Sequence, residues 1–316
     1  MSVWTVLGGG AIGGFVAASL MRSGMSVSLC LSERYRNKPY HPLKFESAEG
    51  VHDEFSPDWV FAPVAQTKVL LVCLKSYHVV AALEKHQRHI DPECVIVLLH
   101  NGMGVSESVQ QRFPHNPIVL GTTANAVVSV GDLSVKQMGY GDTWLGTLEA
   151  HDGLTNASLA RWFQAIPRSY WTQNIAEKVW LKLAVNSAIN PITALHQCRN
   201  GALMEEAHRP LFEQVVQEIY AVCTAERLPW SQQELRRKIV EVVELTAQNY
   251  SSMNRDVFYG RKTEIESILG HLINRAHLSG IMLPNCRRLY DGIKQMESHY
   301  LTQSDTDQHS ATLVTL

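Results

Sequence analysis

A glycine-rich turn near the start of the chain limits its possible folds more than any other feature. Val3 to Leu7 is a short apolar segment typical of a strand, and it runs directly into GGGAIGG at residues 8–14. Helical periodicity follows as far as Gly24, and a second apolar segment covers residues 26–31. Strand, glycine turn, helix and strand within about 30 residues is the context that the G-x-G-x-x-G motif requires. We therefore predict a βαβ unit that begins a parallel sheet.

The spacing of these glycines predicts a phosphate-binding loop. Gly8 permits the tight turn, Gly10 lets the backbone approach a pyrophosphate, and Gly13 lets the helix pack close to the strand. The N-terminus of the helix adds free N–H groups and the positive end of its dipole. The predicted ligand is a dinucleotide, and its predicted contacts are Gly8, Gly9, Gly10, Ala11, Ile12 and Gly13.

The end of the second strand bears on the choice between NAD and NADP. An acidic residue there binds the ribose hydroxyls of NAD, whereas a nearby cation accommodates the 2′-phosphate of NADP. Glu33 argues for NAD, while Arg34 and Arg36 argue for NADP. Ser32 stands at the strand end itself, where a hydroxyl tolerates a phosphate that a carboxylate would repel. These residues favour NADP(H), with Ser32 and Arg34 among its contacts.

Two further apolar runs, at residues 69–74 and 94–99, have the composition of buried parallel strands. Each is followed by polar residues, which include Lys75 after the first run and Asn101 after the second. Ligands of open α/β sheets bind beyond the carboxyl ends of the strands, so we expect both side chains at the cofactor. The alternative for Asn101-Gly102 is an ordinary turn.

The length and the order of these signals predict two domains. A chain of 316 residues is long for one hydrophobic core and comfortable for two. Residues 117–147 are β-rich, and helical periodicity dominates from Asn174 onward, with residues 170–173 as a hinge. We predict an α/β fold with an N-terminal Rossmann-type dinucleotide-binding domain (1–173) and a C-terminal all-α domain (174–316). Amphipathic helices are predicted over residues 211–227, 231–248 and 262–279, and a disordered tail from about residue 303.

The charge and the apolar pattern exclude several classes of partner. A formal net charge of −2 provides no electrostatic footprint for nucleic acid or for an anionic membrane. No run of about 18 apolar residues is present, and the N-terminus begins with a strand pattern instead of a signal peptide. The six cysteines are scattered, as expected of reduced thiols. We expect a cytoplasmic protein that acts on a small molecule.

Fourteen histidines raise the question of a metal site. The chain has no H-E-x-x-H motif, and its cysteines lack zinc-ligand spacing. His86 and His89 lie in the polar segment EKHQRH, which we interpret as a solvated helix face. We expect no bound metal.

Residues 180–191, WLKLAVNSAINP, combine an apolar helix with a polar stripe. Lys182, Asn186 and Asn190 recur at four-residue spacing, and positions four apart differ by only about 40° around a helix. The remaining positions are apolar nearly all round, which is typical of a buried helix. A lysine and two amides there cost roughly several kcal/mol unless each finds a partner or a ligand. The alternative is a snorkelling lysine with two amides bonded to backbone carbonyls.

Two polar features lie further along the helical half. The segment Ser251-Ser252-Met253 is a small polar loop of the type that binds carboxylates through hydroxyl and backbone groups. Glu264 falls just after a predicted loop. It is either a functional carboxylate or a first-turn acid favoured by the helix dipole.

Together these segments resemble the ketopantoate reductases (2-dehydropantoate 2-reductases). The resemblance covers most of the chain and is carried by GGGAIG, CLKS, LLHNGMG, KLAVNSAINPITA, CRNGAL, SSM and RKTEIESILG. Its most specific part is the block KLAVNxxINPxTA, followed further on by TEI. The resemblance implies an oxidoreductase that reduces ketopantoate to pantoate with NADPH, on the route to pantothenate and coenzyme A.

The resemblance also implies roles for individual residues. Lys182 corresponds to the general acid. Glu264 would lie at the cofactor ribose or the substrate, Asn101 at the junction of the two, and Lys75 along the cofactor. The hydroxyl and carboxylate of the substrate would be held by Asn186, Asn190, Asn200 and Ser252. Family members often carry arginine where Ser32 stands, so recognition of the 2′-phosphate would move to Arg34 or Arg36, or be weaker.

The chemistry of the polar stripe agrees with these roles. Hydride delivery to a keto carbon creates an alkoxide, which needs a proton or a positive charge within hydrogen-bond reach. A lysine on a buried helix is desolvated, which lowers its pKa and makes its proton easier to give up. We expect the reaction in a cleft between the two domains. Two alternatives stay open: a related NADP-dependent reductase of another short 2-keto acid, and a non-catalytic NADP-sensing binding protein. Monomer and homodimer are both compatible with the sequence.

Overall fold

The computed structural model describes the backbone of residues 3–148 and 159–312 and divides into two compact units, Met1–Val179 and Trp180–Leu316. The division falls within one helix, α5 (Ile175–His196), a few residues beyond the boundary expected after residue 173. That boundary stays a prediction. The backbone of helix α10 (Pro284–Thr312) runs past residue 303, whereas side chains are described only as far as Thr302, so the disordered tail also stays a prediction.

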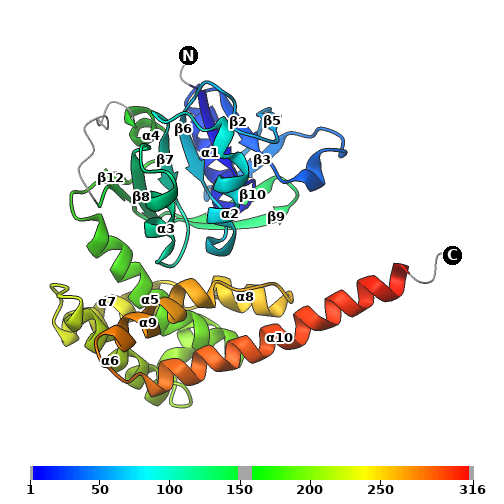
Figure 1. Cartoon of the computed structure of the whole chain (residues 1–316). Coiled ribbons are helices and arrows are strands. Elements are labelled where there is room, and N and C mark those ends of the chain that lie inside the picture. The colour runs from blue at the N-terminus through cyan, green and yellow to red at the C-terminus, as the bar shows by residue number, and fades with distance from the viewer. Residues whose placement is uncertain (1–2, 149–158, 313–316) are drawn as a thin grey trace. The chain divides into compact units, whose positions relative to one another are not determined.

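Unit 1 is built on an eight-stranded sheet (sheet A) with the order β12-β11-β8-β7-β6-β1-β2-β5 (Figure 1). Its strands are β1 (Val3–Leu7), β2 (Val27–Cys30), β5 (Asp58–Val60), β6 (Thr67–Val72), β7 (Val95–Leu98), β8 (Ile118–Thr123), β11 (Thr143–Gly146) and β12 (Ser169–Trp171). Neighbouring strands are parallel except for the antiparallel pair β8 and β11. The chain reverses its direction of travel across the sheet between β1 and β6, which is the switch point where ligands of doubly wound sheets bind. The predicted Rossmann-type architecture is confirmed.

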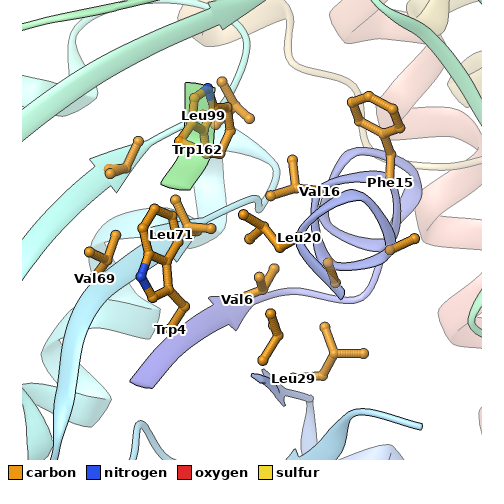
Figure 2. Packing of buried hydrophobic residues seen from close by; sticks show 14 of the residues in the cluster. Trp4, Val6, Phe15, Val16, Leu20, Leu29, Val69, Leu71, Leu99 and Trp162 are labelled. Carbon is orange, nitrogen blue, oxygen red and sulfur yellow. The ribbon is translucent and has the colours of Figure 1, made fainter. Parts of the chain in front are cut away.

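Helices and 3₁₀ turns connect these strands and cover both faces of sheet A. They are α1 (Ala11–Arg22), η1 (Glu33–Tyr35), α2 (Ser76–His86), η2 (Gln87–His89), α3 (Val105–Arg112) and α4 (Ala160–Ala165). Figure 2 shows Val16 and Leu20 of α1 turned toward Val6 of β1 and Leu71 of β6 in one buried cluster. The preceding residue of β6, Leu70, belongs to the cluster on the other face, with α2 and α3. Successive side chains of a strand point to opposite faces, so a strand covered on both sides is apolar throughout.

A second sheet of four strands (sheet B), with the order β4-β3-β10-β9, packs on α1. Its strands are β3 (Leu43–Glu46), β4 (His52–Phe55), β9 (Ala126–Gly131) and β10 (Ser134–Gly139). The contact with α1 is close, because a Cβ at Gly14 would lie 2.8 Å from Val135. The prediction of β structure over residues 117–147 is confirmed, whereas the β3–β4 hairpin was not foreseen.

His86 corrects one expectation. It was assigned to a solvated helix face, yet its side chain is buried, while His89 is exposed. On α2 it follows Val79 and Leu83 at spacings of four and three residues, and both of those face the core. A histidine at that position shares the buried stripe, because residues three and four apart lie on one helix face. Burial is also the main cause that lowers the pKa of His86.

The regular secondary structure described in unit 2 is all helical. Its elements are the rest of α5, η3 (Asn200–Met204), α6 (Arg209–Ala225), α7 (Gln232–Leu245), α8 (Ser252–Phe258), the π-helical turn η4 (Glu266–Gly270), α9 (His271–Leu278) and α10. The predicted all-α C-terminal part is confirmed. Ser251 to Met253, expected as a loop, is instead a helix start: Ser251 is the N-cap of α8, and its hydroxyl accepts the N–H of Asn254 at 3.1 Å. Small polar residues favour N-caps and loops alike, which explains the error.

The N-terminus of helix α10 is capped by a carboxylate from another helix. Glu218 of α6 accepts the backbone N–H groups of Asn285 (2.9 Å) and Cys286 (2.8 Å). The first turn of α10 has no acidic residue of its own. Glu218 therefore satisfies N–H groups that the helix itself leaves without partners. Within the described ranges, no helix is long and apolar enough to cross a membrane.

Candidate active site

The glycine turn after β1 has the geometry expected of a phosphate cradle. Gly8 has a φ of +108°, and a Cβ there would lie 2.8 Å from the carbonyl oxygen of Cys73. A Cβ at Gly13 would lie only 1.9 Å from the carbonyl oxygen of Gly8. Both positions therefore require glycine, Gly8 for the turn and Gly13 for the close approach of helix and strand.

Gly10 differs from these two because a Cβ there would meet no atom within 4 Å. It is the N-cap of α1, it provides no side-chain cap, and the first turn of α1 has no acidic residue. The first helical bond runs from the Gly14 N–H to the Gly10 carbonyl (2.7 Å), so the N–H groups of Ala11, Ile12 and Gly13 precede it. Open space beside these donors and the positive helix end suit a phosphate. The cradle therefore fits a dinucleotide.

Lys75 and Asn101 lie at the same edge of sheet A as the cradle. Lys75 is the N-cap of α2, shortly after β6, and Asn101 follows β7. Strands β1, β6 and β7 are parallel neighbours, so their carboxyl ends meet at this edge. Both side chains are half-buried. Gly102 has a φ of +81°, so a glycine turn is present as well, and it begins directly after Asn101.

The end of β2 carries a surplus of positive charge. Glu33 accepts hydrogen bonds from Arg36 (2.6 and 3.2 Å) and from Lys85 (3.1 Å). These bonds lower the pKa of the Glu33 carboxyl to about 2, so it stays ionised. The guanidinium of Arg34 lies over the Tyr35 ring and donates to its hydroxyl at 3.2 Å. The exposed Ser32 is the N-cap of η1. Asp132, which accepts from the Tyr35 hydroxyl and pairs with Lys38, adds one carboxylate and one cation. Four cations (Arg34, Arg36, Lys38 and Lys85) thus outnumber two carboxylates (Glu33 and Asp132) in this group.

The polar stripe of α5 lies on a largely buried helix, as predicted. Trp180, Leu183, Ala184, Ala188 and Ile189 are all buried. Lys182 and Asn186 are half-buried, and Asn190 is 5% exposed. Pro191 lies inside the helix and lacks the N–H that would bond the Ser187 carbonyl. The hydroxyl of Ser187 is also buried without a hydrogen-bond partner in the described part of the chain, and it was not foreseen as a polar site.

The ammonium of Lys182 and the carboxylate of Glu264 act on each other electrostatically. Burial lowers the pKa of Lys182 to about 8, and the negative charge of Glu264 opposes that shift. Glu264 is 4% exposed, although a first-turn acid that serves only the helix dipole needs no burial. A buried carboxylate is costly unless it is paired. The burial therefore favours a functional role for Glu264 over the helix-dipole interpretation.

Asn200 presents an unsatisfied acceptor. Its amide nitrogen donates to the Thr246 hydroxyl at 2.9 Å, whereas its Oδ1 is buried and has no hydrogen-bond partner among the described residues. A buried acceptor without a donor costs about 1–3 kcal/mol. A ligand hydroxyl would satisfy it. Ser252, also predicted to bind substrate, is exposed in the first turn of α8.

Several polar residues around these side chains were missed. The hydroxyls of Thr193 on α5 and Ser251 lie 2.8 Å apart, and the Asn254 amide donates to the Thr193 carbonyl at 2.7 Å. These bonds tie the start of α8 to α5. Asp256, four residues after Ser252, is 6% exposed. Its spacing from Ser252 on one helix is the only signal that the sequence offered.

The predicted site residues fall into two sets. The glycine cradle, Ser32, Arg34, Lys75 and Asn101 belong to unit 1, where the cradle, Lys75 and Asn101 share one sheet edge. Lys182, Asn186, Asn190, Asn200, Ser252 and Glu264 belong to unit 2. Their roles toward a ligand stay predictions. Among the residues that the structure describes, no group of three or more His, Cys, Asp or Glu side chains could hold a metal ion.

Comparison with known proteins covers both units. Residues 4–150 match the family model described as ketopantoate reductase PanE/ApbA, and residues 174–297 match its C-terminal model. A 2-dehydropantoate 2-reductase of Vibrio cholerae is 31% identical over 93% of this chain and 98% of its own length. The crystal structure of a PanE/ApbA family ketopantoate reductase from Ralstonia eutropha superposes with a TM-score of 0.85 at 21% identity, covering 95% of this chain and 100% of that one. D-mandelate dehydrogenase with NADH and anilino(oxo)acetate has a TM-score of 0.83 at 21% identity, covering 95% and 99%.

Proposed function

The chain belongs to the ketopantoate reductase family, and from this we propose that it reduces 2-dehydropantoate (ketopantoate) to pantoate with NADPH, on the route to pantothenate and coenzyme A. The observation that supports this most is the lysine on α5 whose pKa burial lowers to about 8, accompanied by a buried glutamate and two amides. Its partners in this proposal are the cofactor and one small 2-keto acid, bound by a monomer or a homodimer in the cytoplasm.

The chain's own residues would hold the cofactor at three places. The N–H groups at the start of α1 bind the pyrophosphate, and Arg34 beside Ser32 binds the 2′-phosphate. Lys75 and Asn101 lie along the cofactor beyond β6 and β7. The hydride comes from the nicotinamide of the bound NADPH.

Lys182 would supply the proton. As the keto carbon accepts a hydride, its oxygen gains negative charge, and an ammonium within hydrogen-bond reach both stabilises that charge and donates to it. A pKa of about 8 keeps Lys182 mostly protonated at neutral pH, yet its proton is released more readily than that of an ordinary lysine. The negative charge of Glu264 keeps that pKa from falling further.

The amides and the serine would orient the substrate. Asn186 and Asn190 lie one and two helical turns from Lys182, so their positions relative to the proton donor are fixed by one helix. The unsatisfied Oδ1 of Asn200 suits the hydroxyl hydrogen of ketopantoate. Ser252 at the start of α8 suits its carboxylate. A different short 2-keto acid with a hydroxyl would meet the same donors, so turnover on a panel of 2-keto acids is the test of substrate identity.

The pH dependence of the reduction follows from the Lys182 pKa. The reaction needs the protonated lysine, so kcat/KM should be level below pH about 8 and fall about ten-fold per pH unit above it. Glu264→Gln removes the charge that raises this pKa, so the alkaline limb should move to lower pH. Steady-state kinetics across this range provide the measurement. A level profile up to pH about 10 would contradict Lys182 as the proton donor.

The cofactor preference depends on the cations at the end of β2. Wild-type kcat/KM should be higher with NADPH than with NADH, and Arg34→Ala should lower this ratio by about ten-fold, because the 2′-phosphate loses a charged partner. Arg22→Ala, which removes a cation paired with Asp53 at the end of α1, is the matched control and should leave the ratio unchanged. A ratio that favours NADH in the wild type would show that Glu33 decides the preference instead.

A further inference from the structure

One face of α10 holds the segment that carries Glu264. Tyr290, Lys294 and Glu297 follow one another at spacings of four and three residues, so they line one face of the helix. All three contact residues 263–266, the segment that contains Glu264. None of the three was singled out by the sequence, and the proposed reaction does not use them directly.

Glu297 makes the buried contacts of this face. Its Oε1 accepts both the backbone N–H of Thr263 (2.6 Å) and the Thr263 hydroxyl (2.7 Å). Its Oε2 lies 3.4 Å from the Lys294 ammonium. Glu297 is 3% exposed and Thr263 is 1% exposed. A carboxylate so deeply buried is tolerated because donors satisfy it, and bonds to a charged acceptor are stronger than neutral ones.

The two bonds fix the backbone immediately before Glu264. The Thr263 hydroxyl, held by Glu297, also accepts the N–H of Ile265 at 3.2 Å. Glu264 thus lies between two residues whose backbone positions depend on one carboxylate. The helix that follows opens with the π-helical turn η4. Such turns are rare in proteins, and those that occur are often found at functional sites.

The outer contacts of the same face are weaker. Glu266 accepts from the Tyr290 hydroxyl (2.7 Å) and pairs with Lys294 (3.1 Å), but its side chain is 55% exposed. Exposed ion pairs contribute little, because solvent screens them. Glu297 therefore provides most of the restraint on the Glu264 segment.

We propose that Glu297 is a positioning residue: it fixes the backbone before Glu264 so that the Glu264 carboxylate stays within electrostatic reach of the Lys182 ammonium. This inference rests on the proposed reductase function. Glu297 touches neither substrate nor cofactor in this role. The negative charge of Glu264 raises the pKa of Lys182, so in this role Glu297 influences the proton donor through Glu264.

Two substitutions of Glu297 separate positioning from charge. Glu297→Ala removes the acceptor, so the Glu264 segment should shift, kcat should fall by about ten-fold or more, and the alkaline limb of kcat/KM should move to lower pH, as in Glu264→Gln. Glu297→Gln keeps an oxygen that both Thr263 donors can reach, so it should restore kcat to within about three-fold of wild type and leave the limb in place.

A double mutant and a matched control complete the test. If Glu297 acts through Glu264, the alkaline limb of Glu264→Gln combined with Glu297→Ala should coincide with that of Glu264→Gln alone. Glu218→Gln is the matched control, because Glu218 is another carboxylate that accepts backbone N–H groups, here at the start of α10. This substitution should lower the melting temperature without moving the alkaline limb of kcat/KM.

A folded Glu297→Ala variant with a wild-type kcat and an unshifted alkaline limb of kcat/KM would overturn the proposal. If that variant does not fold, Thr263→Val decides, because it deletes the hydroxyl bond and keeps the backbone bond. A limb at lower pH supports the proposal, and an unchanged limb overturns it. Failure of the proposed function is distinct, since the wild type would then show no ketopantoate-dependent oxidation of NADPH.

Discussion

Lys182→Ala should lower kcat for ketopantoate reduction by about a hundred-fold or more. The alkoxide that forms on hydride transfer would lose both its proton donor and the positive charge that stabilises it. The positions one and two turns after Lys182 on its stripe of α5 are the amides Asn186 and Asn190, which cannot replace an ammonium. Lys178, one turn before, is engaged by the Trp144 ring. Binding of NADPH should be unaffected, because the glycine cradle belongs to unit 1.

Lys178→Ala is the matched control for this experiment. Lys178 lies one turn earlier on α5, and its ammonium lies over the Trp144 ring at 4.0 Å. Its removal deletes the same charge from the same helix and should leave kcat unchanged. Steady-state rates at saturating NADPH and ketopantoate provide the measurement. A Lys182→Ala enzyme with wild-type kcat would return Lys182 to the interpretation of a snorkelling lysine.

Gly10→Ala should weaken cofactor binding without loss of stability, whereas Gly13→Ala should lower the stability of the fold. A Cβ at Gly10 meets no atom of the protein, so the variant should fold with a wild-type melting temperature. The added methyl would occupy the space proposed for the pyrophosphate, so NADPH binding should weaken by about ten-fold or more, or about 1.4 kcal/mol. A Cβ at Gly13 would overlap the carbonyl oxygen of Gly8, so that variant should lose about 1–3 kcal/mol of stability.

Thermal unfolding and NADPH titration of both variants separate these outcomes. Gly10→Ala that binds NADPH as tightly as the wild type would show that the cofactor does not approach the backbone there. Gly13→Ala with wild-type stability would contradict the close contact between α1 and the turn after β1.

Much of unit 1 could be predicted because its signals are local. The glycine turn between two apolar segments specifies a βαβ unit, and the continuous apolar runs of β6 and β7 indicate strands covered on both faces. The β3–β4 hairpin was missed because β4, with the sequence HDEF, has little apolar character of its own. It forms by pairing with β3, which pairs in turn with the distant strand β10.

The same distinction applies to the candidate site. Lys182, Asn186 and Asn190 could be placed on one stripe because helix geometry fixes their spacing. The contact between Thr263 and Glu297 joins a loop residue to a helix residue 34 positions further along the chain, and no local pattern announces it. The N-cap role of Ser251 escaped for another reason, since serine is equally common in loops and at helix starts.

The central claim is that this chain transfers a hydride from NADPH to ketopantoate. The most direct test is an absorbance assay of NADPH consumption by the wild-type protein with ketopantoate, with pantoate quantified in the same reaction. We expect ketopantoate-dependent oxidation of NADPH with one pantoate formed for each NADPH consumed. Tight binding of NADPH without any consumption in the presence of ketopantoate would contradict the claim and favour a cofactor-sensing protein.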